Sequence, residues 1–162
     1  METRRQMFTE GLVAGLIGYA TIAVFYGLLN VALGSSVWST ARLLGGGLVS
    51  EGVAESMPLA PVLAFNAVHL AALLVVGLVV SWLVYETERH PEIWLLTFFG
   101  GLMALFFAEG FMLVVAEPAI TVLPWWSVIL ANLLAGFAVG GYLLRSHRAL
   151  LQRLKEMGAD EL

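Results

Sequence analysis

The sequence predicts an all-α membrane protein, a compact bundle of four transmembrane helices. Of its 162 residues, 60% are hydrophobic and 12% are charged, and the mean hydropathy is +0.89. This composition lies outside that of soluble domains. A helix needs about 20 apolar residues to cross the hydrocarbon core of a bilayer. Four stretches reach this length, so we expect a single membrane domain over 1–162, with spans at about 8–33, 60–85, 93–116 and 122–144.

The first predicted span begins after two arginines, Arg4 and Arg5. Its apolar stretch is longer than the roughly 7–15 residues of a signal-peptide core, and no small-residue cleavage site closes it. We therefore expect an anchored helix rather than a cleaved signal peptide. The spans are helical because lipid leaves backbone groups no partners outside the segment, and they lack the alternating pattern of a barrel.

The outer loop 34–58 is the longest connection between spans. Part of it has apolar residues at helical spacing, followed by Gly45, Gly46 and Gly47. This pattern favours a short interfacial helix that ends at the glycines, with an irregular loop as the alternative. Its predicted lipid-facing residues are Val37, Trp38, Ala41 and Leu44.

The distribution of Lys and Arg predicts that both termini are cytoplasmic. Seven of the eight basic residues flank the predicted inner ends, and only Arg42 lies in the outer loop. By the positive-inside rule this orients the chain in a bacterial inner membrane. The basic tail 145–162 is expected to extend the fourth helix along anionic lipid headgroups. No basic patch suits nucleic acid, and the absence of cysteine excludes disulfides and thiolate sites.

Every predicted span contains small residues four positions apart, which allow helices to approach closely in a membrane. This spacing favours a compact bundle. The residues are Gly11 and Gly15, Ala67 and Ala71, Gly100 with Ala104 and Ala108, Ala131 with Ala135, and Gly136 with Gly140.

Polar residues in the four spans fall at similar depths. At ~1.5 Å per residue, Tyr26 and Glu109 lie roughly 10 Å below the outer ends, His69 roughly 13 Å and Asn132 roughly 15 Å. An ionisable group in a span costs at least ~2.5–3.5 kcal/mol at the helix centre, so Glu109 needs a partner or a purpose. Helical spacing adds two residues to the faces of this layer, Asn66 beside His69 and Asn30 beside Tyr26.

This layer is compatible with three uses. It predicts first a hydrogen-bonded cluster that connects the helices. A binding site for haem, quinone or metal is the second, with His69, Glu109 and Met112 as weak candidate metal ligands, because a catalytic zinc site normally has three protein ligands. The third is a transport path, although few polar residues continue it toward the inner face.

The fourth span carries a loose resemblance to a known group of proteins. Its residues Trp125-Trp126, Asn132 to Gly136 and Gly140 to Leu143 precede a basic tail, and Val68-His69-Leu70 and Gly77-Leu78 add to the pattern. The chain resembles uncharacterised four-helix bacterial inner-membrane proteins. This resemblance implies a membrane bundle and no particular chemistry.

No motif predicts an enzyme, since nucleophile elbows and phosphate-binding glycine loops are absent from the sequence. We therefore expect a small accessory or scaffolding subunit of a larger membrane assembly, whose partners are the lipid bilayer and other membrane subunits or further copies of the chain. The alternatives are an intramembrane small-molecule or cofactor binder, and a transporter or channel formed by oligomerisation.

Overall fold

The computed structural model describes residues 2–90, 93–115 and 123–147, with the side chains of all except 2–3, 94, 104–105, 108–109 and 111–115. These residues form helices and connecting turns without strands, which confirms the all-α prediction. The helices are α1 (Glu2–Ala32), α2 (Ser39–Gly46), α3 (Glu51–Ser56), α4 (Ala60–Arg89), α5 (Trp94–Val115) and α6 (Trp125–Ser146).

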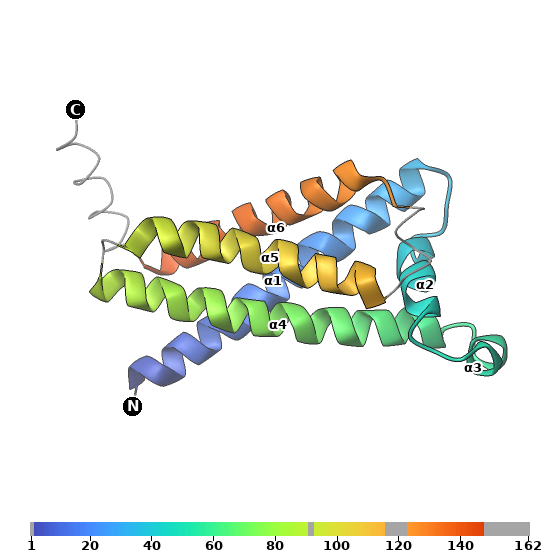
Figure 1. Ribbon diagram of the computed structural model, residues 1–162, viewed down its shortest axis with the longest axis horizontal. Helices are drawn as coiled ribbons and strands as arrows, with labels where there is room; N and C mark the ends of the chain where they lie inside the picture. Colours follow the sequence, from blue (N-terminus) through green and yellow to red (C-terminus); the bar gives the residue numbers. More distant parts are fainter. Residues whose placement is uncertain (1, 91–92, 116–122, 148–162) are drawn as a thin grey trace.

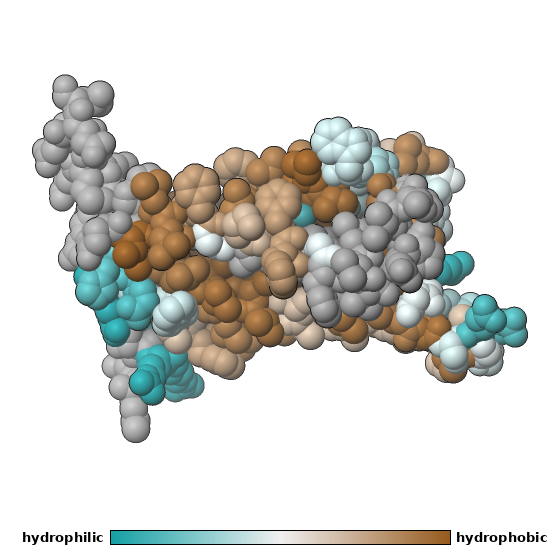
Figure 2. Space-filling view, in the orientation of Figure 1, coloured by the Kyte–Doolittle hydropathy of each residue, from teal (hydrophilic) through white to brown (hydrophobic). Residues whose placement is uncertain are grey.

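The four long helices α1, α4, α5 and α6 lie side by side and alternate in direction (Figure 1). The start of α1 and the end of α6 therefore lie at one end of the bundle, which we call the terminal end. The short helices α2 and α3 lie at the opposite end, which we call the loop end. Figure 2 shows apolar residues along the helices and hydrophilic residues gathered at both ends.

Among the described residues, three helices are long and apolar enough to cross a membrane, Arg4–Ala32, Ala60–Arg89 and Trp125–Ser146. The sequence predicted four such helices. The additional span was expected at 93–116, where the 22-residue α5 lies, but α5 is not one of these three. The second span extends beyond its predicted end at residue 85, because α4 continues through polar residues to Arg89.

The close approach of α1 and α4 depends on glycine. A Cβ atom on Gly77 would overlap the backbone of Gly11 and Gly15, with the Gly15 Cα only 2.8 Å away. A Cβ on Gly15 would lie 2.7 Å from the Cα of Leu74. The prediction that Gly11 and Gly15 form a helix contact is therefore confirmed, and side chains there would force the helices apart.

Other predicted small-residue contacts had mixed outcomes. Ala131 and Ala135 of α6 are fully buried, as expected. Ala67 and Ala71 of α4 are exposed, so their predicted role in packing within the chain is wrong. The spacing of small residues was correct for a helix contact, but it did not determine which face of α4 meets α1.

The loop 34–58 contains the predicted short helix, α2, but with a different orientation. Ala41 and Leu44 are only 9% and 5% exposed, whereas Val37 and Trp38 are 47% and 53% exposed. The prediction that all four face lipid is therefore wrong for Ala41 and Leu44. These two residues are on the face that packs into the bundle, where Gly45 lies so close to Pro61 that a Cβ would overlap its backbone.

Candidate functional site

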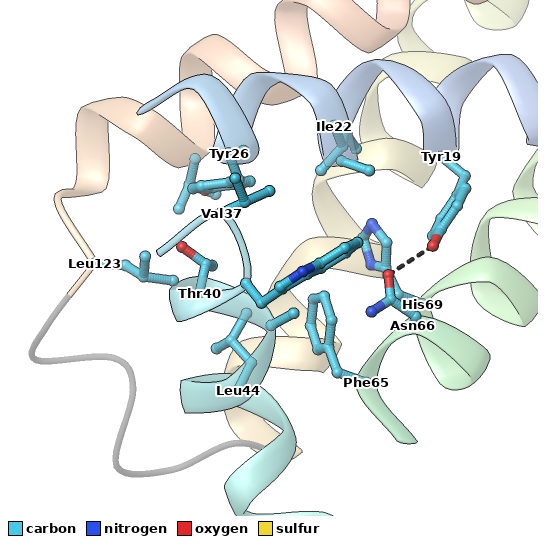
Figure 3. Close-up of a pocket in the computed structure, with 15 residues that line it drawn as sticks. Tyr19, Ile22, Tyr26, Val37, Thr40, Leu44, Phe65, Asn66, His69 and Leu123 are labelled. Carbon is cyan, nitrogen blue, oxygen red and sulfur yellow. Dashed lines mark hydrogen bonds between the residues drawn. The ribbon is translucent and has the colours of Figure 1, made fainter. Parts of the chain in front are cut away.

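A cavity of about 60 Å³ lies at the loop end, between α1, α2, α4 and the start of α6. This is several times the roughly 10–15 Å³ that one water molecule requires. Figure 3 shows Tyr19 and Tyr26 of α1, Thr40 of α2, and Phe65 and His69 of α4 around it. The lining is thus mostly apolar, with several aromatic rings and a few polar groups.

His69 is held in this lining by aromatic neighbours. Its side chain is buried, and its ring stacks on Phe65 with the ring centroids 5.2 Å apart and the planes 12° apart. Tyr19 lies on another side of the imidazole, with a centroid separation of 5.9 Å. Phe65 precedes His69 by four residues on α4, so the helix itself places the two rings one above the other.

Neutral hydrogen bonds connect the helices around the cavity. The Tyr19 hydroxyl donates to Asn66 Oδ1 at 2.6 Å, which joins α1 to α4 (Figure 3). The hydroxyl of Thr40 donates to Asn30 Oδ1 at 3.0 Å, and Asn30 Nδ2 donates to the Val37 carbonyl at 3.1 Å. These bonds hold α2 and the turn before it against the end of α1.

The structure brings together part of the predicted polar layer. Tyr26, Asn66 and His69 all line the cavity, and Asn30 reaches it through Thr40. Asn132 is fully buried but is not part of the lining. Its Nδ2 donates to the Val128 carbonyl of its own helix at 2.9 Å, and its Oδ1 has no hydrogen-bond partner among the described atoms.

The predicted pairing of Glu109 with His69 stays a prediction, because the side chains of Glu109 and Met112 lie outside those that the structure describes. The described residues include no group of three or more His, Cys, Asp or Glu side chains arranged to hold a metal ion. The metal set of His69, Glu109 and Met112 is likewise a prediction.

A second site lies at the terminal end, where three ionisable side chains from three parts of the chain meet. His147 Nδ1 is 2.6 Å from Glu88 Oε1, and His147 Nε2 is 2.9 Å from Glu10 Oε2. The side chains of His147 and Glu10 are 5% and 12% exposed, and that of Glu88 is 31% exposed. We call these three residues the Glu-His-Glu cluster.

The helices around the Glu-His-Glu cluster are fixed by further contacts. The rings of Tyr85 and His147 pack in a T-shaped arrangement, with the centroids 4.8 Å apart and the planes at 86°. Ser81, one turn before Tyr85 on α4, donates from its hydroxyl to the Met7 carbonyl of α1 at 3.0 Å. The backbone N–H of His147 donates to the Leu143 carbonyl at 2.9 Å, so the imidazole is attached directly to the end of α6.

Sequence reasoning did not find the Glu-His-Glu cluster, because each residue alone resembles a solvated residue at the end of a span. The available signal was again depth, since all three residues lie near the same predicted membrane surface. Sequence reasoning also did not identify Tyr19 and Thr40 as the hydrogen-bond donors to Asn66 and Asn30 at the loop end.

The chain matches no family model, no curated protein and no solved structure. Function is therefore inferred from its own residues.

Proposed function

We propose that the chain is a four-span protein of a bacterial inner membrane that serves as an accessory or scaffolding subunit of a larger membrane assembly. The observation that carries this proposal is the outward face of α5. Phe98, Phe99, Met103 and Phe107 are 57–77% exposed. At 3.6 residues per turn, the exposed positions of α5 cover about half of the helix circumference.

The membrane placement of α5 is supported by its length. Its 22 residues extend about 33 Å at ~1.5 Å per residue, which compares with a hydrocarbon core of about 30 Å. Its ends are at the same two ends of the bundle as those of α1, α4 and α6 (Figure 1). The concentration of basic residues beside the terminal end favours a cytoplasmic location for that end.

The two sides of α5 differ in a way that favours a partner helix. Toward α4 it presents Gly100 and Gly101, where added Cβ atoms would meet Leu83 and Val80 at ordinary contact distances. Its exposed side carries large aromatic residues. Helices associate in membranes through van der Waals packing and not through a hydrophobic drive. We infer that the protruding rings of α5 pack against small residues of a partner helix.

Photocrosslinking in native membranes tests the scaffold proposal. A photoreactive residue replaces Phe107 of α5 or, as the matched control, Val24 of α1. Both positions are exposed, at 77% and 59%, and each lies eight residues from the loop end of its helix. We expect Phe107 to give a discrete protein adduct, either another subunit or a second copy, and Val24 to give lipid adducts. Lipid adducts at both positions would contradict the proposal.

Thiol labelling tests the orientation independently, because the chain has no cysteine. Ser50→Cys places a thiol in the predicted outer loop, and Ser146→Cys places one at the terminal end. A membrane-impermeant maleimide added to spheroplasts should label only Ser50→Cys. Labelling of only Ser146→Cys would show the opposite orientation.

The cavity at the loop end favours a second candidate function, binding of a small planar molecule such as a quinone head group. Stacked aromatic rings around a cavity with a few polar groups are typical of small-molecule sites. Haem or a metal would need ligands in addition to His69. Mass spectrometry, the visible spectrum and the metal content of the protein purified in mild detergent would identify a resident ligand.

A matched pair of variants connects such a ligand to the cavity. Ala23→Phe adds a ring at a cavity-lining position of α1. Ala20→Phe adds the same ring at an exposed position one turn earlier, outside the lining. We expect the ligand to be lost from Ala23→Phe and retained by Ala20→Phe. If the wild-type protein purifies without a ligand, the ligand-binding proposal is contradicted and only the scaffold proposal remains.

A further inference from the structure

The cavity at the loop end has an opening beside α1. Ala23 of α1, and Val37 and Trp38 of the turn before α2, line the cavity and are also exposed on the surface of the protein. We infer that this opening is a lateral entrance through which the cavity takes an uncharged amphiphile from the bilayer, with the polar head group inside and the hydrocarbon tail in the lipid. The inference rests on the second proposed function, ligand binding in this cavity, and specifies the class of the ligand and its route.

The depth of the opening places it beside acyl chains. The 31 residues of α1 extend about 46 Å at ~1.5 Å per residue, so a centred helix passes roughly 8 Å beyond each side of a hydrocarbon core of about 30 Å. Ala23 lies nine residues before the end of α1, a depth of about 14 Å. Its neighbours Val24 and Leu28 are apolar and exposed, as expected of a surface in contact with lipid. A ligand therefore reaches this opening from the bilayer.

The edge of the opening is held by contacts between α1 and the turn before α2. A Cβ atom on Gly27 would lie 3.4 Å from Val37 Cγ1, so the absence of a side chain lets Val37 pack against α1. Asn30, closer to the end of α1, donates from Nδ2 to the Val37 carbonyl and accepts a hydrogen bond from Thr40. These contacts lie between the opening and the loop end. Ala23, one turn deeper, presents only a methyl group, which leaves the opening clear.

The lining determines which head group suits the cavity. None of the described lining residues is Asp, Glu, Lys or Arg, so a charged head group would lose its hydration without gaining a counter-charge. The polar groups of the lining are hydroxyl, amide and imidazole groups. Asn66 Nδ2 carries two hydrogens and donates one of them to the Val62 carbonyl at 2.7 Å. The second hydrogen suits a carbonyl or hydroxyl oxygen of an uncharged head group.

The volume of the cavity explains why the tail stays outside. A volume of about 60 Å³ corresponds to a few water molecules at roughly 10–15 Å³ each. This is room for a compact head group and not for a hydrocarbon chain. The exposed apolar side chains of Val24 and Trp38 beside the opening provide a surface for the start of the tail. An uncharged amphiphile therefore matches both the polar interior and the apolar surroundings.

Photolabelling in proteoliposomes of phosphatidylethanolamine and phosphatidylglycerol tests the class of the ligand. Two probes have the same acyl chain and the same diazirine next to the head group, but one is an uncharged monoacylglycerol and the other is the anionic lysophosphatidylglycerol. We expect the monoacylglycerol to form adducts with buried lining residues such as His69 and Leu44. The anionic probe should form adducts only with exposed residues. Equal labelling of the buried lining by both probes, or labelling by neither, would overturn the inference.

Two matched pairs of variants test the route. Ala23→Phe fills the opening, so labelling of His69 by the monoacylglycerol should be lost, whereas Ala20→Phe, outside the lining, should retain it. Trp38→Ala removes an exposed indole from the lining and widens the opening, so labelling of His69 should increase. Its control is Trp125→Ala, which removes an exposed indole outside the lining and should label like the wild type.

The outcomes distinguish this inference from the ligand-binding function on which it rests. If the purified protein carries a ligand that is charged or has no hydrocarbon tail, ligand binding in the cavity stands and the inference is overturned. If Ala23→Phe does not fold, the comparison of Trp38→Ala with Trp125→Ala decides. Equal labelling of His69 in these two variants would overturn the lateral entrance.

Discussion

The two ends of the bundle accommodate polar side chains in different ways. At the loop end, neutral side chains such as Tyr19, Asn66 and Thr40 bond to one another around an open cavity. At the terminal end, ionisable side chains contact one another directly. The loop end places neutral groups around a cavity, whereas the terminal end places ionisable groups in direct contact.

Depth explains this difference. His69 and Asn66 lie two to three turns inside α4, where an uncompensated charge in a membrane costs several kcal/mol. Glu88 lies in the last turn of α4, and His147 follows the last residue of α6. Groups at helix ends are close to headgroups and water, so a charged cluster there loses less hydration and costs less free energy. The comparison indicates that ionisable side chains are tolerated at the ends of the helices, whereas neutral hydrogen-bonding side chains are favoured within the bundle.

The glycine crossing of α1 and α4 lies between the two ends, so its disruption should have the largest effect. Gly77→Ala puts a methyl group into the backbone of Gly11 and Gly15, and overpacking of this kind costs up to about 3 kcal/mol. We expect a marked fall in thermal stability in detergent, together with the loss of both the Tyr19–Asn66 bond and the Glu-His-Glu cluster.

The matched control for the crossing is Gly140→Ala on α6, where an added Cβ meets nothing within 4 Å. Alanine is favoured over glycine in a helix by up to about 1 kcal/mol, so this variant should be as stable as the wild type or more stable. Equal destabilisation by Gly77→Ala and Gly140→Ala would show that the crossing does not hold the two ends together.

Removal of the imidazole should affect the terminal end alone. His147→Leu removes the imidazole that contacts both Glu10 and Glu88, which we expect to cost about 2 kcal/mol because the His147 and Glu10 side chains are largely withdrawn from water. Thermal unfolding in detergent measures this loss.

His90→Leu is the control for His147→Leu, since His90 is an exposed histidine near the same end of α4. We expect its stability to be close to that of the wild type. If His147→Leu is no less stable than His90→Leu, the Glu-His-Glu cluster contributes nothing to the stability of the terminal end.

Sequence reasoning was most successful where a single helix determines the result. The spacing of Gly11 and Gly15 predicted a helix contact, and the spacing of Asn66 and His69 placed both on the face that lines the cavity. Periodicity along one helix fixes which residues share a face, but not which neighbour that face meets. The predicted contact through Ala67 and Ala71 failed for this reason.

The remaining features depend on how separate helices are rotated against one another. Ala41 and Leu44 were expected to face lipid, yet α2 turns them toward α4 because Gly45 allows it to approach Pro61 closely. His147 meets residues that are 59 and 137 positions away in the sequence. Only the packing of α1, α4 and α6 brings these groups together, and no local pattern encodes it.

The smallest effect is expected at the loop end, from the hydrogen bond between α1 and α4. Tyr19→Phe removes the donor to Asn66 Oδ1 while it keeps the ring beside His69. Bonds between helices in a membrane are worth about 0.6–1.7 kcal/mol, so we expect a loss of about 1 kcal/mol. Hydrogen exchange should also accelerate in the first turns of α4 and leave the terminal end unchanged.

Thr21→Val is the matched control, because the Thr21 hydroxyl donates to the Ile17 carbonyl of its own helix at 2.8 Å and joins no second helix. It should leave both the stability and the exchange of α4 close to those of the wild type. A terminal end that loosens in Tyr19→Phe as much as the loop end does would contradict the separation of the two ends. The neutral bonds at the loop end and the Glu-His-Glu cluster would then belong to one cooperative network extending through the glycine crossing.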